Sequence, residues 1–129
     1  MIDARILLQC NTWLQERASN LEKVPGLSIE KKGQYVVLFN CSQYLVNWVN
    51  EQLGTGVFPP ATGNAEQYFA ASNYQATCLW LANYYTSIAN IAEADLKKSD
   101  NKQKRSDEQT MIVALAFLRI IEYFKKARA

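Results

Sequence analysis

The chain has 129 residues, of which 49% are apolar and 20% are charged, and its formal net charge is +2. This length suits one domain with a substantial core, and the composition excludes an intrinsically disordered chain. The longest uninterrupted apolar run, Met111 to Leu118, has eight residues, whereas a membrane-spanning helix needs roughly 18. Histidine is absent, which excludes Ser-His-Asp and Cys-His catalysis and imidazole metal sites.

The first predicted element is a helix from about Asp3 to Asn20. Apolar residues recur there at the three- and four-residue spacing of an amphipathic helix: Ile2, Ile6, Cys10, Trp13, Leu14 and Leu21. Asp3 suits the N-terminal end of such a helix because its carboxylate can accept bonds from the first backbone N–H groups. Pro25-Gly26 then breaks the chain.

Residues 27–39 are compatible with two structures. The run 35–39 (YVVLF) is β-branched and aromatic, so a short β-hairpin with residues 27–30 is one of them. The other is a helix that opens at Gly33 and ends before Gly54. Its apolar stripe consists of Leu38, Cys41, Leu45, Trp48 and Leu53. Length favours the helix, since strands rarely exceed ten residues.

A loop is predicted over 54–63 (GTGVFPPATG), because its glycines and paired prolines cannot continue a helix. The next helical pattern extends from Ala65 to about Lys98, and Asn64 with Gln67 forms a weak capping box before it. Ser72-Asn73 either bends this helix or splits it in two.

A charged segment, SDNKQKR over 99–105, predicts a solvated linker, so that a basic linker extends over about 97–106. Ser106 with Gln109 forms a second capping box, which starts a last helix over 107–128. The basic residues at the end of that helix suit the negative end of its dipole. Together these elements predict a single all-α domain over 1–129, folded as a compact four- to five-helix bundle.

The three cysteines, Cys10, Cys41 and Cys78, lie about 30 residues apart without a C-x-x-C pair. We therefore expect reduced thiols that serve as small apolar core residues in a cytoplasmic protein, and no disulfide framework or zinc site. Asp3 and Arg5 interrupt the apolar N-terminus, so no secretion signal is expected.

A search for reactive groups finds no converging set. The chain has no phosphate-binding loop, because Gly54-Thr55-Gly56 leads into Val-Phe-Pro-Pro without the lysine that such a loop requires. Acidic residues in EF-hand spacing are also missing. We therefore expect a noncatalytic protein without a cofactor or a bound metal.

Charge is distributed very unevenly along the chain. The 63 residues from Gly33 to Asp95 contain no lysine or arginine, whereas residues 97–129 contain nine basic and four acidic residues. Basic runs beside a neutral bundle can follow a phosphate backbone through charge alone, and they can equally be solvated surface. The candidate nucleic-acid-binding residues are Lys31, Lys32, Lys97, Lys98, Lys102, Lys104, Arg105, Arg119, Lys125 and Lys126.

The neutral stretch is rich in large aromatic residues, more than one small core readily hides. They are Tyr44, Trp48, Tyr68, Phe69, Trp80, Tyr84 and Tyr85. Some of them are expected on surfaces that face partners, where tyrosine and tryptophan are enriched.

Two segments carry a resemblance to a known family. Residues 24–39 (VPGLSIEKKGQYVVLF) place a proline-bearing turn, a basic pair and a Gly-Gln step before an apolar segment. Residues 114–126 (ALAFLRIIEYFKK) resemble the closing helix of that family. Together they resemble the small helical subunit of CRISPR Cascade- and Cmr-type RNA-guided effector complexes. The family tends to carry Asn-Gly-Leu-Gly where this chain has Lys31-Lys32-Gly33-Gln34.

The resemblance implies a noncatalytic subunit that stacks in copies inside a ribonucleoprotein. Its basic surface residues would support the guide–target duplex or the displaced DNA strand, and its neutral faces would meet the other subunits. Lys31 and Lys32 fall in the first matched segment, and Arg119, Lys125 and Lys126 fall in the second. The alternative is a helical protein–protein adaptor with no nucleic-acid role.

Overall fold

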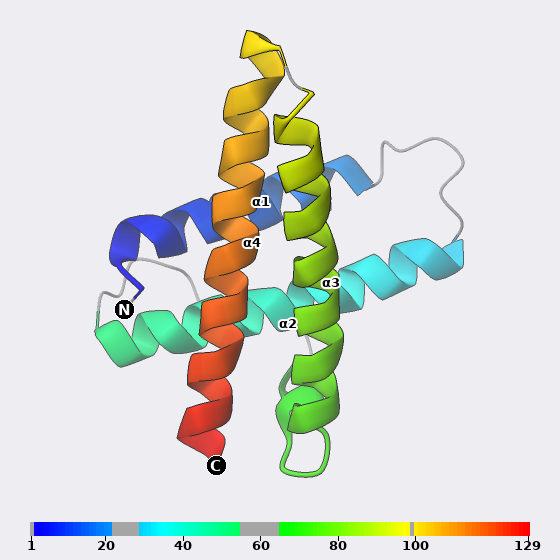
Figure 1. Cartoon of the computed structure of the whole chain (residues 1–129). Coiled ribbons are helices and arrows are strands. Elements are labelled where there is room, and N and C mark those ends of the chain that lie inside the picture. The colour runs from blue at the N-terminus through cyan, green and yellow to red at the C-terminus, as the bar shows by residue number, and fades with distance from the viewer. Residues whose placement is uncertain (1, 22–28, 55–64, 99) are drawn as a thin grey trace.

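The computed structural model describes residues 2–21, 29–54, 65–98 and 100–129 (Figure 1). These residues form four α-helices and one short 3-10 helix, η1, and contain no strand, which confirms the all-α bundle. In chain order the elements are α1 (Ala4–Leu21), α2 (Ile29–Leu53), η1 (Ala65–Phe69), α3 (Tyr74–Leu96) and α4 (Asn101–Arg128).

The helices form two hairpins that cross each other (Figure 1). Helices α1 and α2 lie side by side in one layer, and α3 and α4 lie antiparallel in the other. Both α1 and α2 contact α4, and η1 lies against α2 and α3. The end of the α3–α4 hairpin that joins the two helices projects beyond the α1–α2 layer (Figure 1). We call this end, residues 93–109, the tip.

Helix α1 begins as its sequence predicts. The Asp3 carboxylate accepts a hydrogen bond from the Ile6 backbone N–H at 2.9 Å, which caps the helix. The buried residues of α1 follow the expected spacing and include Leu7, Cys10, Trp13 and Leu14.

Helix α2 decides between the two structures considered for 27–39. Residues 29–39 are helical, so the hairpin is wrong where the chain is described; residues 27 and 28 lie outside that part. The helix begins at Ile29, four residues before Gly33. Burial explains why the strand-like run 35–39 is helical, because α2 packs against α1, α4 and η1. Its buried residues cover more than one face: Leu38, Phe39, Cys41, Leu45, Val46 and Val49.

Gly54 ends α2 in the left-handed region, with φ at 69°, and its N–H donates to the Glu51 carbonyl at 3.1 Å. This is the predicted C-terminal glycine. The predicted loop lies, apart from Gly54, outside the described residues, as does Asn64 of the weak capping box.

The predicted helix over 65–98 is split, and the break lies where Ser72-Asn73 indicated it. Residues 65–69 form η1, a turn follows, and α3 begins at Tyr74. The Thr77 hydroxyl donates to the Tyr68 carbonyl at 2.6 Å, and this bond holds η1 against the first turn of α3.

Helix α4 begins at Asn101, six residues before the predicted start. The linker predicted over 97–106 is correspondingly shorter, and Lys102, Lys104 and Arg105 lie on the helix. Its cap is Asp100, whose carboxylate accepts from the backbone N–H groups of residues 102 and 103, both at 3.1 Å. Lysine, glutamine and arginine are good helix formers, so a capped charged run continues as helix. Ser106 is an interior residue of α4 and not its cap.

Aromatic rings join the two layers. Tyr85 of α3 stacks on Phe117 of α4 at a centroid distance of 4.2 Å, and Trp13 of α1 lies against both rings. The Tyr85 hydroxyl also donates to the Ser42 hydroxyl of α2 at 2.6 Å, and Ser42 donates onward to the Leu38 carbonyl at 2.9 Å. In the described part of the chain, no helix is both long enough and apolar enough to cross a membrane.

Candidate functional site

The titratable groups with clearly shifted pKa values lie in the core. Burial raises the pKa of the Cys10 thiol to about 12 and that of Cys41 to about 11, and it also raises the pKa of Cys78. These thiols are free and buried, as expected for small apolar core residues. They stay protonated at neutral pH, so they do not supply a thiolate nucleophile.

Two neighbouring tyrosines behave in the same way. Burial raises the pKa of Tyr84 to about 12, with a smaller contribution from Tyr35. Burial also raises the pKa of Tyr85 well above its usual value, although the hydrogen bond with Ser42 opposes the shift. Within the described ranges, no three Cys, Asp or Glu side chains are grouped so as to hold a metal ion.

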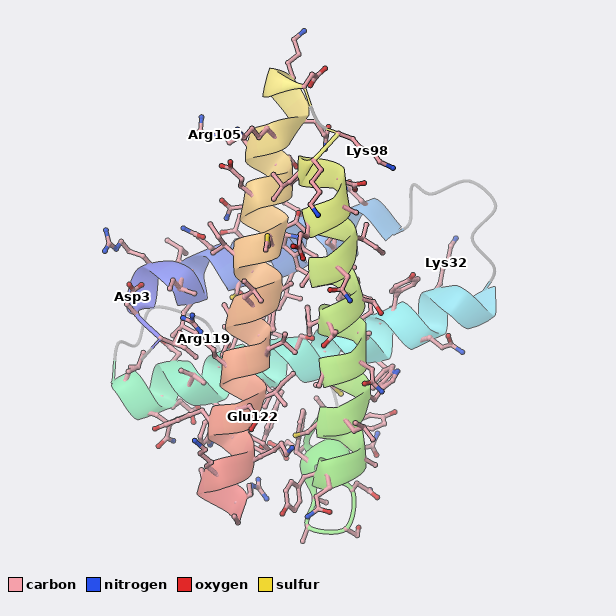
Figure 2. The ribbon with its side chains drawn as sticks, viewed as in Figure 1. Asp3, Lys32, Lys98, Arg105, Arg119 and Glu122 are labelled. Carbon is pink, nitrogen blue, oxygen red and sulfur yellow. The ribbon has the colours of Figure 1, made fainter. Side chains whose placement is uncertain are left out.

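The predicted basic residues lie in three separate places and not on one surface (Figure 2). Lys31 and Lys32 are in the first turn of α2. A second group belongs to the tip, where Figure 2 labels Lys98 and Arg105. The third group, which includes Arg119, lies on the second half of α4.

The tip is electrically balanced. The basic run that the sequence places there has five members: Lys97, Lys98, Lys102, Lys104 and Arg105. The same segment, residues 93–109, also contains five carboxylates: Glu93, Asp95, Asp100, Asp107 and Glu108. Asp107 is buried there and accepts a hydrogen bond from the Gln103 amide at 3.4 Å. The tip therefore has no net charge, and its long-range attraction for phosphate is weak.

The last 20 residues of the chain, which include the second half of α4, carry a net positive charge. Residues 110–129 contain four basic residues and one acidic residue, a net charge of +3. Lys125 forms an ion pair with Glu122 at 3.7 Å, in which both side chains are largely exposed; such a pair contributes only about 0–1 kcal/mol. Arg128 lies with its guanidinium carbon 5.0 Å from the Phe124 ring centroid. Arg128 was not among the predicted nucleic-acid-binding residues. Phe124, four positions earlier in the sequence, indicates that an arginine side chain can lie over its ring. We call Arg119, Lys125, Lys126 and Arg128 the basic end of α4.

A groove of about 680 Å³ lies beside this basic end, between α4 and the C-terminal half of α2. Its apolar lining is Ile2, Val49, Leu53, Leu115, Leu118 and Tyr123, and its polar lining is Gln52, Arg119, Glu122 and Lys126. Leu53, Leu115 and Tyr123 are 40%, 42% and 50% exposed, so the groove is an open apolar surface. Sequence reasoning missed the groove because its residues come from three distant segments. Arg119, Glu122 and Lys126, which all line the groove, lie three and four residues apart in the sequence, so the spacing alone puts them on one stripe of α4.

The aromatic residues divide between core and surface. Phe69 and Tyr85 are buried, while Tyr44, Trp48, Tyr68 and Tyr84 are half-buried. Trp80 is exposed on α3, as are Leu79 and Ile91. The α3 sequence from 74 to 92 contains no charged residue, so its exposed side is an uncharged face. Tyr123 was not among the predicted partner-facing residues.

No protein-family model matches the chain, and neither the curated proteins nor the solved structures include a significant match to it.

Proposed function

We propose that this chain is a noncatalytic small subunit of a CRISPR RNA-guided effector complex in the cytoplasm. It contacts the backbone of the guide–target duplex or of the displaced DNA strand through basic side chains. Its neutral surfaces pack against neighbouring subunits, including further copies of itself. The resemblance of residues 24–39 and 114–126 to the small subunit family supports this proposal.

The observation that carries the phosphate contact is the basic end of α4. Its four basic side chains are exposed, and one carboxylate lies among them. Contact with a phosphate backbone depends on net positive charge, because bound cations release condensed counterions from the nucleic acid. The tip has as many carboxylates as cations, so we assign the principal phosphate contact to the basic end of α4 and not to the run 97–105.

Two matched variants of α4 test this assignment. One replaces Lys125, Lys126 and Arg128 with glutamine, and the other replaces Lys102, Lys104 and Arg105 with glutamine. Each removes three positive charges from exposed helix positions and retains good helix formers. Binding of a short labelled RNA–DNA duplex is measured across a salt series, with each variant assembled into the complex of its native host.

The first variant is expected to lower the affinity and to reduce the slope of log K against log salt by about 2–3, since each phosphate contact contributes roughly 0.7–0.9. The second variant is expected to change the slope by less than half as much. A slope that stays unchanged in the first variant contradicts the assignment. The proposal as a whole fails if the protein purifies from its host without RNA and without partner subunits.

A second candidate function is a helical protein–protein adaptor, which the apolar groove and the uncharged face of α3 favour. A protein complex that survives nuclease treatment and is unaffected by glutamine substitutions of Lys125 and Arg128, which do not line the groove, supports the adaptor.

A further inference from the structure

The groove beside α4 has the dimensions and the lining of a helix-binding site. It extends along α4 from Leu115 to Lys126, a length of about 17 Å at 1.5 Å per residue. This length accommodates about three turns of a partner helix. Its floor is apolar, as in the grooves that receive the apolar stripe of an amphipathic helix.

The charge of one groove residue, Arg119, restricts which partner can bind there. Arg119 lies one turn from Leu115 and one turn from Tyr123, in the middle of the groove's length along α4. Figure 2 shows it projecting from α4 on the side where α1 begins. Among the described residues, no carboxylate lies within ion-pair distance of its guanidinium; the nearby Glu122 pairs with Lys125.

Any apolar partner that covers the groove therefore removes Arg119 from water. A charge that is buried without a counter-charge costs several kcal/mol, so a stable partner must bring a carboxylate to this point. Lys126 adds a second cation at one end of the groove. Glu122 is the one carboxylate of the lining and pairs with Lys125, so the lining keeps a net charge of +1 and favours an acidic occupant.

We propose that this groove binds an amphipathic helix of another protein, which inserts an apolar stripe and places an Asp or Glu carboxylate opposite Arg119. The inference goes beyond the proposed function, because it requires no nucleic acid. It assigns Arg119 and Lys126 to the acidic helix and leaves Lys125 and Arg128, which do not line the groove, for phosphate. The uncharged face of α3 in a second copy of the chain does not meet the requirement, since it lacks a carboxylate between residues 74 and 92.

Two synthetic helical peptides test the proposal. Both carry the same leucine stripe; one has glutamates beside the stripe and the other has lysines at the same positions. Their binding to the whole chain is measured by fluorescence anisotropy. The acidic peptide is expected to bind at least about tenfold more tightly than the basic peptide, a difference of about 1.4 kcal/mol.

Variants locate the binding in the groove. Leu115→Glu is expected to weaken the acidic peptide by more than about tenfold, whereas Ile112→Glu, which is also exposed on α4 but does not line the groove, leaves it unchanged. Arg119→Glu reverses the preference in favour of the basic peptide. Because Leu115 and Ile112 are both exposed, these variants keep the fold, which circular dichroism checks.

Three results overturn the proposal. The first is equal binding of the two peptides, or a preference that Arg119→Glu leaves in place. The second is a concentration-dependent dimer, seen by sedimentation velocity, that Leu115→Glu dissolves; the groove then belongs to a second copy. The third is displacement of the acidic peptide by a short oligonucleotide at equal concentration, which assigns Arg119 to phosphate. Glutamine substitutions of Lys125 and Arg128 alone, which do not line the groove, test the nucleic-acid proposal separately.

Discussion

At the scale of single residues, the core holds groups that lose a proton only at high pH. Folding raises the pKa of Cys10 and Cys41 from about 9 to about 12 and 11, because the thiolates have no water or counter-charge around them. In the unfolded chain these thiols return to their ordinary pKa values. The unfolded state therefore releases protons that the folded state keeps.

This difference predicts alkaline sensitivity. Because the folded pKa values are raised, the stabilisation is complete below about pH 9 and decreases as the pH rises toward 11 to 12. Each retained proton steepens the decrease by up to about 1.4 kcal/mol per pH unit. Urea unfolding under reducing conditions from about pH 8 to 10 measures the slope, and the double variant Cys10→Ala, Cys41→Ala flattens it. A wild-type free energy of unfolding that stays constant over this range contradicts the prediction.

At the scale of helices, sequence patterns were reliable where one local signal acted alone. The apolar spacing around Trp13, the stop at Gly54 and the break at Ser72-Asn73 all have local causes, and each was predicted. The choice between strand and helix at 35–39 was left open, because packing against α1, α4 and η1 decides it. The sequence predicts Ser106 as the cap of α4, whereas Asp100 is the cap. The charge of the run between them indicates a solvated linker, but its lysine, glutamine and arginine residues are good helix formers.

The groove could not be predicted from the sequence, because its residues come from distant segments of the chain. Leu53, Leu115 and Ile2 belong to separate segments, and each one alone resembles an ordinary core position. The stripe of α4 that lines the groove could be predicted from spacing, but its neighbours on α2 could not. The charge balance of the tip, by contrast, is visible in the sequence, because Glu93 and Asp95 lie just before the basic run and Asp100 lies within it. The prediction considered only the basic residues of this segment.

The cap of α4 gives a prediction with an internal control. Asp100→Ala removes both bonds to the first N–H groups of α4, a loss of about 1 kcal/mol. The backbone amides of residues 102–106 are then expected to exchange with solvent about fivefold faster, because the tip projects beyond the α1–α2 layer. Ser106→Ala, at the position that the sequence favoured as the cap, leaves their exchange almost unchanged. Equal effects from the two variants would show that Asp100 is not the cap.

At the scale of the whole molecule, the two hairpins meet at an aromatic cluster, in which Trp13 of α1 lies against Tyr85 of α3 and Phe117 of α4. Phe117 is fully buried and stacks on Tyr85. Leu79 of α3, in contrast, is 63% exposed. The two residues are both large and apolar but differ in burial. Truncating each of them therefore shows how much of the stability comes from burial.

Phe117→Ala is expected to lower the free energy of unfolding by about 3–5 kcal/mol, from the lost ring and the cavity it leaves. Leu79→Ala is expected to change it by less than about 0.5 kcal/mol. Chemical denaturation of both variants measures the difference, and Phe117→Leu provides a milder truncation if the alanine variant does not fold. Similar losses at both positions contradict the proposed core.

The bond between the Tyr85 and Ser42 hydroxyls has a consequence for the alignment of the two layers. Apolar helix surfaces that cross each other can shift by one helical turn at little cost in free energy, because an apolar side chain one turn away makes a similar contact. A hydroxyl pair cannot slide in this way: a shift of about 5.4 Å leaves a buried phenol without its acceptor, at a cost of about 1–3 kcal/mol. This pair joins residues 43 positions apart in the chain. The bond therefore fixes the position of the α3–α4 hairpin relative to α2. In this position Val49 and Leu53 of α2 lie opposite Leu115 and Tyr123 of α4, and together they line the groove.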